Sequence, residues 1–330
     1  MALDVKVIIN MAKPIGNIGF GCPLILEENA TKEVAYTEVT NLEALITAGY
    51  TAESNVYKTA QLMFMQEHAP KKIAVCSATS TAKVWLSAES NMSKDWRQLV
   101  VLNAGESETT VADIMATIEA QKTYPKMYYA TLAADDSTEL TVKGIERTVL
   151  CYYTPTESVP CPVAALAAEV AGLEVGSYTL NNMTVKGIKG RELSEEEIEA
   201  LHEKGGITFV LSAGDVVASE GITAGGSFVD NVDGNDYIKQ QIEYKTQKVF
   251  NTNLKVPYTD VGIAQLESAA TDVMKDAQNK GIVETFEVKY ALREDTTEEE
   301  RAARKYIGGN IIYSMAGAIH KIEVNCEVSA

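Results

Sequence analysis

The sequence contains no run of apolar residues long enough to cross a membrane. A membrane helix needs about 18–20 consecutive apolar residues, and no segment of the 330-residue chain reaches that length. The first residues, MALDVKVIINMAKPIG, also lack the basic, then apolar, then small-residue order of a secretory signal, because Asp4 precedes only a few apolar residues. We therefore expect synthesis in a cytoplasm and no insertion into a membrane.

Paired cysteines are missing as well. The five cysteines are scattered and none stands in a CxxC pair: Cys22, Cys76, Cys151, Cys161 and Cys326. This pattern is typical of structural thiols in a reducing compartment. It disfavours a disulfide framework, a thiolate metal centre and a redox site.

Motifs for catalysis and ligand binding are scarce. The three histidines, His68, His202 and His320, lie far apart and none belongs to an HExxH motif. The stretch GNIGFG has the wrong spacing for a dinucleotide loop, and GxxxxGK[ST] occurs nowhere. The acidic segment 230–236 misses the register of a calcium loop and is better explained as a turn and N-cap before a helix. The sequence therefore predicts no enzyme, no cofactor and no metal.

Positive charge is in short supply. Lys and Arg number 29 against 46 Asp and Glu, which gives a formal net charge of −17. Proteins that bind nucleic acid normally carry a basic face, so this balance argues against a nucleic-acid partner. Association between copies of so acidic a chain depends on local charge complementarity.

The pattern of the remaining residues indicates an α/β fold class (α+β mixed) and more than one domain. Prolines at 155, 160 and 162 mark the expected boundary. Before it, periodicity predicts helices over 41–49, 52–68, 108–121 and 137–147, and strands over 71–79, 98–104, 126–133 and 148–154. After it, we expect helices over 162–172, 194–205, 230–250, 260–280 and 297–305, and strands over 183–188, 207–213, 215–222, 283–293, 310–316 and 318–328.

The chain thus begins and ends in half-apolar strands. Apolar residues alternate at both termini: Val5, Val7, Ile9 and Met11, then Ile322, Val324, Cys326 and Val328. The segment KPIGNIGFGCP follows the first strand and carries a predicted hinge at Pro14, Gly16, Gly19 and Gly21. Each terminal strand could complete its own sheet or be donated to a neighbouring copy, and periodicity leaves both possibilities open.

Four segments in the second half resemble, in order and spacing, the tail sheath proteins of contractile phages and R-type bacteriocins. They are CPVAALAAEVAGLEVGSYTLNNMTVKGI (161–188), GSFVDNVDGNDYIKQQIEYKTQKVF (226–250), KVPYTDVGIAQLESAATDVMKDAQNKGIV (255–283) and EEERAARKYIGGNIIYSMAGAIHKIEVNCEV (298–328). NIGFGCPLIL and the helix after Thr40 match more loosely. No single segment is diagnostic, and the ordered set of four carries the resemblance.

The resemblance implies an architecture. It predicts an N-terminal arm strand and hinge (1–22), a variable α/β domain facing partly outward (23–155), a sheath core domain (156–317) and a C-terminal arm strand (318–330). The arms would be donated to adjacent subunits through Val5, Val7, Ile9, Met11, Ile319, Ile322, Val324, Cys326 and Val328. Lysines on the long helices are candidates for contact with an inner tube: Lys239, Lys245, Lys248, Lys275 and Lys280.

The function implied is that of a structural sheath subunit, which polymerises with itself around a tube and contracts to drive the tube through a cell envelope. Baseplate and tail terminator proteins are the other partners implied, and the tail of a virion or a phage-tail-like particle is the location. Two alternatives stay open. One is a nucleotide-binding enzyme with a Rossmann-like first domain, and the other is a different tail or baseplate protein.

Overall fold

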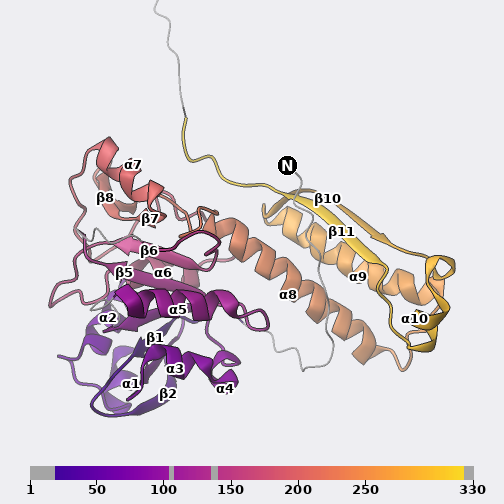
Figure 1. Ribbon diagram of the computed structural model, residues 1–330, viewed down its shortest axis with the longest axis horizontal. Coiled ribbons are helices and arrows are strands. Elements are labelled where there is room, and N and C mark those ends of the chain that lie inside the picture. Colours follow the sequence, from indigo (N-terminus) through magenta and orange to yellow (C-terminus); the bar gives the residue numbers. More distant parts are fainter. Residues whose placement is uncertain (1–18, 104–107, 135–139, 323–330) are drawn as a thin grey trace, which may run out of the picture. The chain divides into compact units, whose positions relative to one another are not determined.

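The computed structural model describes residues 19–103, 108–134 and 140–322, with the elements labelled in Figure 1. The described residues divide into two compact units, which we call the N-terminal unit (19–236) and the C-terminal unit (237–322). Helix α8 (Val229–Thr252) begins in the first unit and continues into the second.

The N-terminal unit is built on a seven-stranded sheet in the order β2-β3-β1-β4-β5-β6-β7. All neighbouring strands are parallel except β2, which is antiparallel at one edge. The strands are β1 (Leu24–Glu27), β2 (Val34–Val39), β3 (Ile73–Ser77), β4 (Gln98–Leu102), β5 (Met127–Leu132), β6 (Thr148–Tyr152) and β7 (Gly206–Ile207). A second sheet pairs β8 (Phe209–Ser212) with β9 (Asp215–Ala218).

Helices cover both faces of the main sheet. Successive residues of a strand point to opposite faces, so Ile73 and Val75 enter one hydrophobic cluster while Ala74 and Cys76 enter the other. The first cluster includes side chains of α1 (Leu42–Thr47), α2 (Asn55–Phe64) and α6 (Ala164–Gly172), and the second those of α3 (Ala82–Ser87) and α5 (Glu108–Ala120). The short α4 (Glu89–Met92) and the acidic α7 (Glu195–Glu203) complete the unit. The three-layer arrangement confirms the predicted α/β class.

The C-terminal unit is simpler. Apart from its share of α8, it holds α9 (Asp260–Asn279), β10 (Val283–Tyr290), a 3-10 turn η2 (Arg293–Asp295), α10 (Glu298–Ala302) and β11 (Gly309–Met315). Strands β10 and β11 form an antiparallel two-stranded sheet, and β10 packs along α9. Helix α9 buries apolar side chains at helical spacing, including Ile263, Leu266, Ala270 and Val273.

The two compact units do not follow the expected boundary at residues 155 and 156. Strand β7 pairs with β6, and α6 packs against α2, so residues on both sides of this point share one core. The division falls between Asp236 and Tyr237 instead. Which segment is the sheath core and which faces outward stays a prediction.

Two expected elements are absent from the described residues, and so is the described part of a third, because residues 318–322 of the strand predicted over 318–328 form no strand. The helix predicted over 137–147 is wrong for 140–147, which form turns and irregular structure, and Gly144 there has a φ of 79° that continues no helix. The strand predicted over 183–188 is reduced to one isolated bridge between Thr184 and Val217. Sequence periodicity also missed β1, which lies between β3 and β4, and the edge strand β2.

Candidate assembly site

The two-stranded sheet of the C-terminal unit has the properties of a strand acceptor. Within the described residues, β10 and β11 each have one strand neighbour, which is the other. The outer edge of such a strand presents backbone N–H and C=O groups to which another extended chain can bind. The register runs from Val283 opposite Met315 to Tyr290 opposite Gly309, with an irregularity between Val283 and Thr285.

The two faces of this sheet differ in polarity. On one face, Phe286 of β10 lies opposite Tyr313 of β11, and Val288 lies opposite Ile311. Both Ile311 and Tyr313 are buried. On the other face, the hydroxyl groups of Thr285 and Ser314 are hydrogen-bonded at 2.7 Å, and Glu287 lies opposite Ile312. One face therefore belongs to the core of the unit, while the edges remain for additional strands.

Three tyrosines fix the connection between the two strands. The ring of Tyr306 stacks on that of Tyr290 at 5.8 Å and meets that of Tyr258 edge-on at 6.1 Å. The Tyr306 hydroxyl donates to the carbonyl of Ala291 at 2.8 Å, and burial raises its pKa to about 12. Gly309 allows this packing, because a Cβ there would lie 2.9 Å from the ring of Tyr290. The strand pair is thus held at the end where its connection lies.

The predicted C-terminal arm starts directly after β11. The amide of Ala316 donates to the carbonyl of Ile282 at 3.0 Å, and Gly317 then turns the chain with a φ of 65°. Ile319 and Ile322 are 90% and 84% exposed and belong to no strand. Apolar side chains this exposed are available to another surface. The remaining arm residues, Val324, Cys326 and Val328, lie outside the described part of the chain.

The N-terminal arm residues Val5, Val7, Ile9 and Met11 and the hinge residues Pro14 and Gly16 also lie outside the described residues. Gly19 and Gly21 do not. The Gly19 amide donates to Asp95 at 2.9 Å, and Gln98 donates to the carbonyl of Phe20, which sits between them, at 2.9 Å. These hydrogen bonds fix Gly19 and Phe20 to the N-terminal unit, which argues against a hinge at Gly19 and Gly21. The hinge at Pro14 and Gly16 stays a prediction.

The five candidate tube-contact lysines share no single face. Lys245, Lys248 and Lys275 are exposed, whereas Lys239 and Lys280 are half-buried. The ammonium group of Lys280 lies over the ring of Tyr237 at 5.9 Å. Lys245 and Lys248 lie one turn apart on α8, while Lys275 belongs to α9 and Lys280 caps its C-terminal end. Contact of these lysines with a tube stays a prediction.

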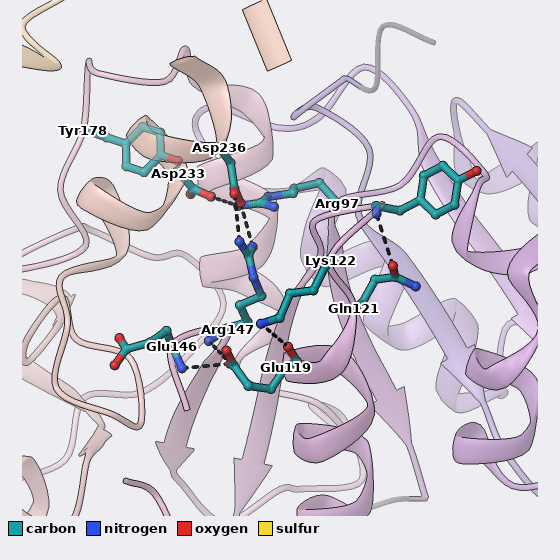
Figure 2. Close-up of polar contacts among 10 residues, drawn as sticks. Arg97, Glu119, Gln121, Lys122, Glu146, Arg147, Tyr178, Asp233 and Asp236 are labelled. Carbon is teal, nitrogen blue, oxygen red and sulfur yellow. Dashed lines mark hydrogen bonds and ion pairs between the residues drawn. The ribbon is translucent and has the colours of Figure 1, made fainter. Parts of the chain in front are cut away.

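A buried ionic cluster holds the first turns of α8, as Figure 2 shows. Arg97, 1% exposed, donates to Asp233 and is paired with Asp236 at 2.7 Å. Arg147 donates to both oxygens of Asp236, at 2.7 and 2.8 Å, and Tyr178 donates to Asp233 at 2.7 Å. Burial acts to raise the pKa of Asp236, but Arg97 and Arg147 hold it below its ordinary value.

The predicted helix over 230–250 is confirmed, because α8 begins at Val229. The explanation of residues 230–236 as a turn before the helix is wrong, since these residues form the first turns of α8. Asp233 and Asp236 are three residues apart and therefore lie on one helix face. That spacing was the available signal. Their cationic partners come from distant segments that no local pattern connects to α8.

The carboxyl ends of β1 and β4 test the nucleotide-enzyme alternative. Strands β3, β1, β4, β5 and β6 follow the order of flavodoxin-like sheets, in which ligands bind at the ends of the first and third strands. Here the carboxylate of Glu28, a buried side chain, accepts the amide of Ala82 at 2.6 Å at the start of α3. Glu27 accepts the Ser77 hydroxyl at 2.6 Å beside it. Two carboxylates at this end of the sheet repel a phosphate, which disfavours a nucleotide.

Neither a membrane-spanning helix nor a cluster of metal ligands is found among the described residues. No helix among them combines the length and the apolar character that a membrane span requires. In the same part of the chain, no three His, Cys, Asp or Glu side chains gather where they could hold a metal ion.

Comparison with known proteins places the fold in one class, the sheath proteins of contractile injection systems and tails. No protein-family model matches the sequence, and no curated protein matches it. Among solved structures, the chain is similar to the helical sheath of the anti-feeding prophage in its contracted state, with a TM-score of 0.73 and 12% identity over 99% of this chain and 98% of that chain.

Two further structures extend this likeness. The contracted sheath complex of PVC, an extracellular contractile injection system, gives a TM-score of 0.72 and 11% identity over 100% of this chain and 97% of that chain. The sheath tail protein of Listeria innocua gives a TM-score of 0.58 and 10% identity over 85% and 90%. The resemblance inferred from the four sequence segments is therefore confirmed at the level of the fold.

Proposed function

We propose that this chain is the structural subunit of a contractile sheath, which polymerises around an inner tube and contracts to drive it through a cell envelope. The observation that carries the proposal is the agreement in fold over nearly the full length of both chains with the contracted sheath of the anti-feeding prophage. Such agreement includes the C-terminal unit as well as the sheet unit. A structural role also accords with the absence of catalytic motifs from the sequence.

The test is direct visualisation of the purified full-length chain. We expect electron microscopy to show hollow cylinders with transverse striations, because a sheath subunit assembles with itself. A chain that stays monomeric at high concentration, and that also fails to coat a co-expressed tube protein, would contradict the proposal. Binding of a nucleotide, seen as a rise in melting temperature, would favour the enzyme alternative instead.

Donated strands are the proposed link between subunits. In this scheme residues 5–11 and 319–328 leave their own body and pair with the edges of the β10–β11 sheet in neighbouring copies. The exposed Ile319 and Ile322 support the proposal, as do the edges of a sheet with only two strands. Each donated strand would supply about four to six backbone hydrogen bonds at about 0.5–1.5 kcal/mol each. Such links can persist while weaker contacts between the bodies exchange during contraction.

Truncation separates the arm from the body. A chain that ends at Gly317 keeps β11 and the contact between Ala316 and Ile282, so we expect it to fold with unchanged thermal stability but to lose polymerisation. Full-length protein with Ile319→Ser and Ile322→Ser is the matched control for apolar contact, and it should assemble weakly. Polymerisation of the truncated chain at the wild-type critical concentration would exclude donation by the C-terminal arm.

The remaining partners follow from the same proposal. The tube would lie in the lumen of the cylinder, and the baseplate and a terminator protein would lie at its two ends. The whole would be part of a phage tail or a phage-tail-like particle. One similar chain belongs to the baseplate structure of the anti-feeding prophage, with a TM-score of 0.72 over 100% of both chains. This supports an association with a baseplate as part of the proposed role.

A further inference from the structure

The end of α8 and the loop after it form a basic and apolar surface on an otherwise acidic chain. Residues 244–259 contain Lys245, Lys248 and Lys255 and no Asp or Glu, although the whole chain carries a net charge of −17. All three lysines are exposed, and none forms an ion pair within the described part of the chain. We call these lysines, with the apolar residues described next, the basic patch.

Apolar side chains accompany the lysines. Leu254 is fully exposed and Val261 is 70% exposed. Beside them, an open groove of about 560 Å³ runs between α8 and α9, lined by Val249, Asn253, Val261, Ala264, Gln265 and Ser268. Exposed apolar surface rimmed by charge is typical of a site where another protein binds. The lysines set the kind of partner, because they favour an acidic one.

The same chain carries a surface of opposite charge on α7. This nine-residue helix contains five glutamates and no Lys or Arg, and it contributes no buried side chain to its own unit. Glu197 is used in the capping box with Ser194. Glu195, Glu199 and Glu203 follow one another at four-residue spacing and so form one stripe. All three are exposed, and the described residues provide no cationic partner for them.

We propose that the basic patch of one copy docks on the α7 stripe of a second copy. The proposal rests on the proposed function, since it names a contact within the sheath polymer. Two different surfaces meet in it, so the contact is heterologous, and repeated heterologous contacts build the open helical assembly that a sheath requires. The stripe spans about 12 Å along α7, a length that two lysines one turn apart and a third beyond the helix end can follow. In this proposal Lys245 and Lys248 contact a second copy of the chain and not a tube.

Charge exchange in the full-length protein tests this contact. One variant carries Lys245→Glu, Lys248→Glu and Lys255→Glu, a second carries Glu195→Lys, Glu199→Lys and Glu203→Lys, and a third combines both sets. We expect each of the first two to raise the critical concentration for polymerisation about tenfold or more, because like charges then face each other. The combined variant should return to within about threefold of wild type, since the attraction is restored with its sign exchanged.

Matched controls make the outcome decisive. Lys71→Glu, Lys122→Glu and Lys143→Glu change the net charge of the chain equally at three exposed positions elsewhere, and this variant should assemble as wild type does. Circular dichroism and thermal unfolding check that every variant folds. If the basic-patch variant assembles like this control, or if the combined variant is not rescued, the contact is wrong while the sheath function stands. A defect that appears only in the presence of a tube would assign the patch to the tube and likewise overturn the proposal. Failure of the wild type to polymerise would instead reject the sheath function.

Discussion

At the scale of single residues, the start of α8 depends on an ion cluster that is almost wholly removed from water. The carboxylate of Asp236 is paired with Arg97 once and with Arg147 through both of its oxygens, and its side chain is 7% exposed. Removing one charge from such a cluster leaves the others buried without compensation. The position of α8 within the N-terminal unit therefore depends on every member of the cluster remaining in place.

Substitution of Asp236 measures this dependence. We expect Asp236→Asn to lower the free energy of unfolding by about 3–5 kcal/mol, because Arg97 and Arg147 lose their shared carboxylate. Asp272→Asn, at an exposed position of α9, should change it by less than about 0.5 kcal/mol. Chemical denaturation followed by fluorescence gives both values. Equal effects of the two substitutions would show that the cluster does not anchor α8.

Lys126 adds a titratable group close to this cluster. Its side chain is fully buried, its ammonium group donates to the carbonyls of Lys94 (2.9 Å) and Trp96, and it lies over the ring of Trp96 at 4.3 Å. Burial lowers the pKa of Lys126 to about 7, and the nearby Arg97 acts in the same direction. Asp95 and Cys22 face the same group and oppose the shift.

This lowered pKa predicts the pH dependence of stability. Between pH 7 and the unfolded value of about 10.5, the unfolded chain holds a proton that the folded chain lacks, so raising the pH stabilises the fold. From pH 7 to pH 9 we expect Lys126 to contribute a gain of about 2 kcal/mol. The measurement is the difference in unfolding free energy between wild type and Lys126→Met at each pH, which cancels the opposite effect of the buried cysteines. A difference that does not vary with pH would mean that Lys126 stays charged in the fold.

At the scale of elements, long helices and buried strands could be predicted from the sequence. The capping box of Ser194 and Glu197 marks the start of α7, and Thr259 caps α9 where the sequence places its helix start. Local signals of this kind act between neighbours in the chain, so a single sequence contains them. Strands β10 and β11 were predicted separately. Their pairing was not predicted, because it joins residues between 19 positions (Tyr290 and Gly309) and 32 positions (Val283 and Met315) apart.

Elements with weak local signals were missed. Strand β1 has only four residues, LILE, directly after the glycine-rich lead-in, yet it is the middle strand between β3 and β4. The helix predicted over 137–147 is wrong for residues 140–147, whose apolar side chains are Leu140, Val142 and Ile145. In the structure these side chains pack against a hydrophobic cluster from an irregular segment. Tertiary burial there satisfies the apolar residues without regular secondary structure.

At the scale of the whole molecule, the proposed sheath would hold its copies together by two kinds of link. Strand addition to the β10–β11 sheet would be resistant to salt, since backbone hydrogen bonds and apolar contact carry it. Contacts between charged surfaces such as the basic patch and α7 would weaken as ionic strength rises. A chain with a net charge of −17 needs such local complementarity before its copies can approach. In the proposed function, contraction would exchange the second kind of link while the first persists.

A helical reconstruction of the assembled chain by electron cryomicroscopy tests the central claim most directly. We predict a polymer in which the β10–β11 sheet of each subunit gains strands that trace to residues 5–11 and 319–328 of neighbouring copies. Density in which this sheet remains two-stranded, with both terminal segments folded back on their own subunit, would contradict the account even if cylinders form.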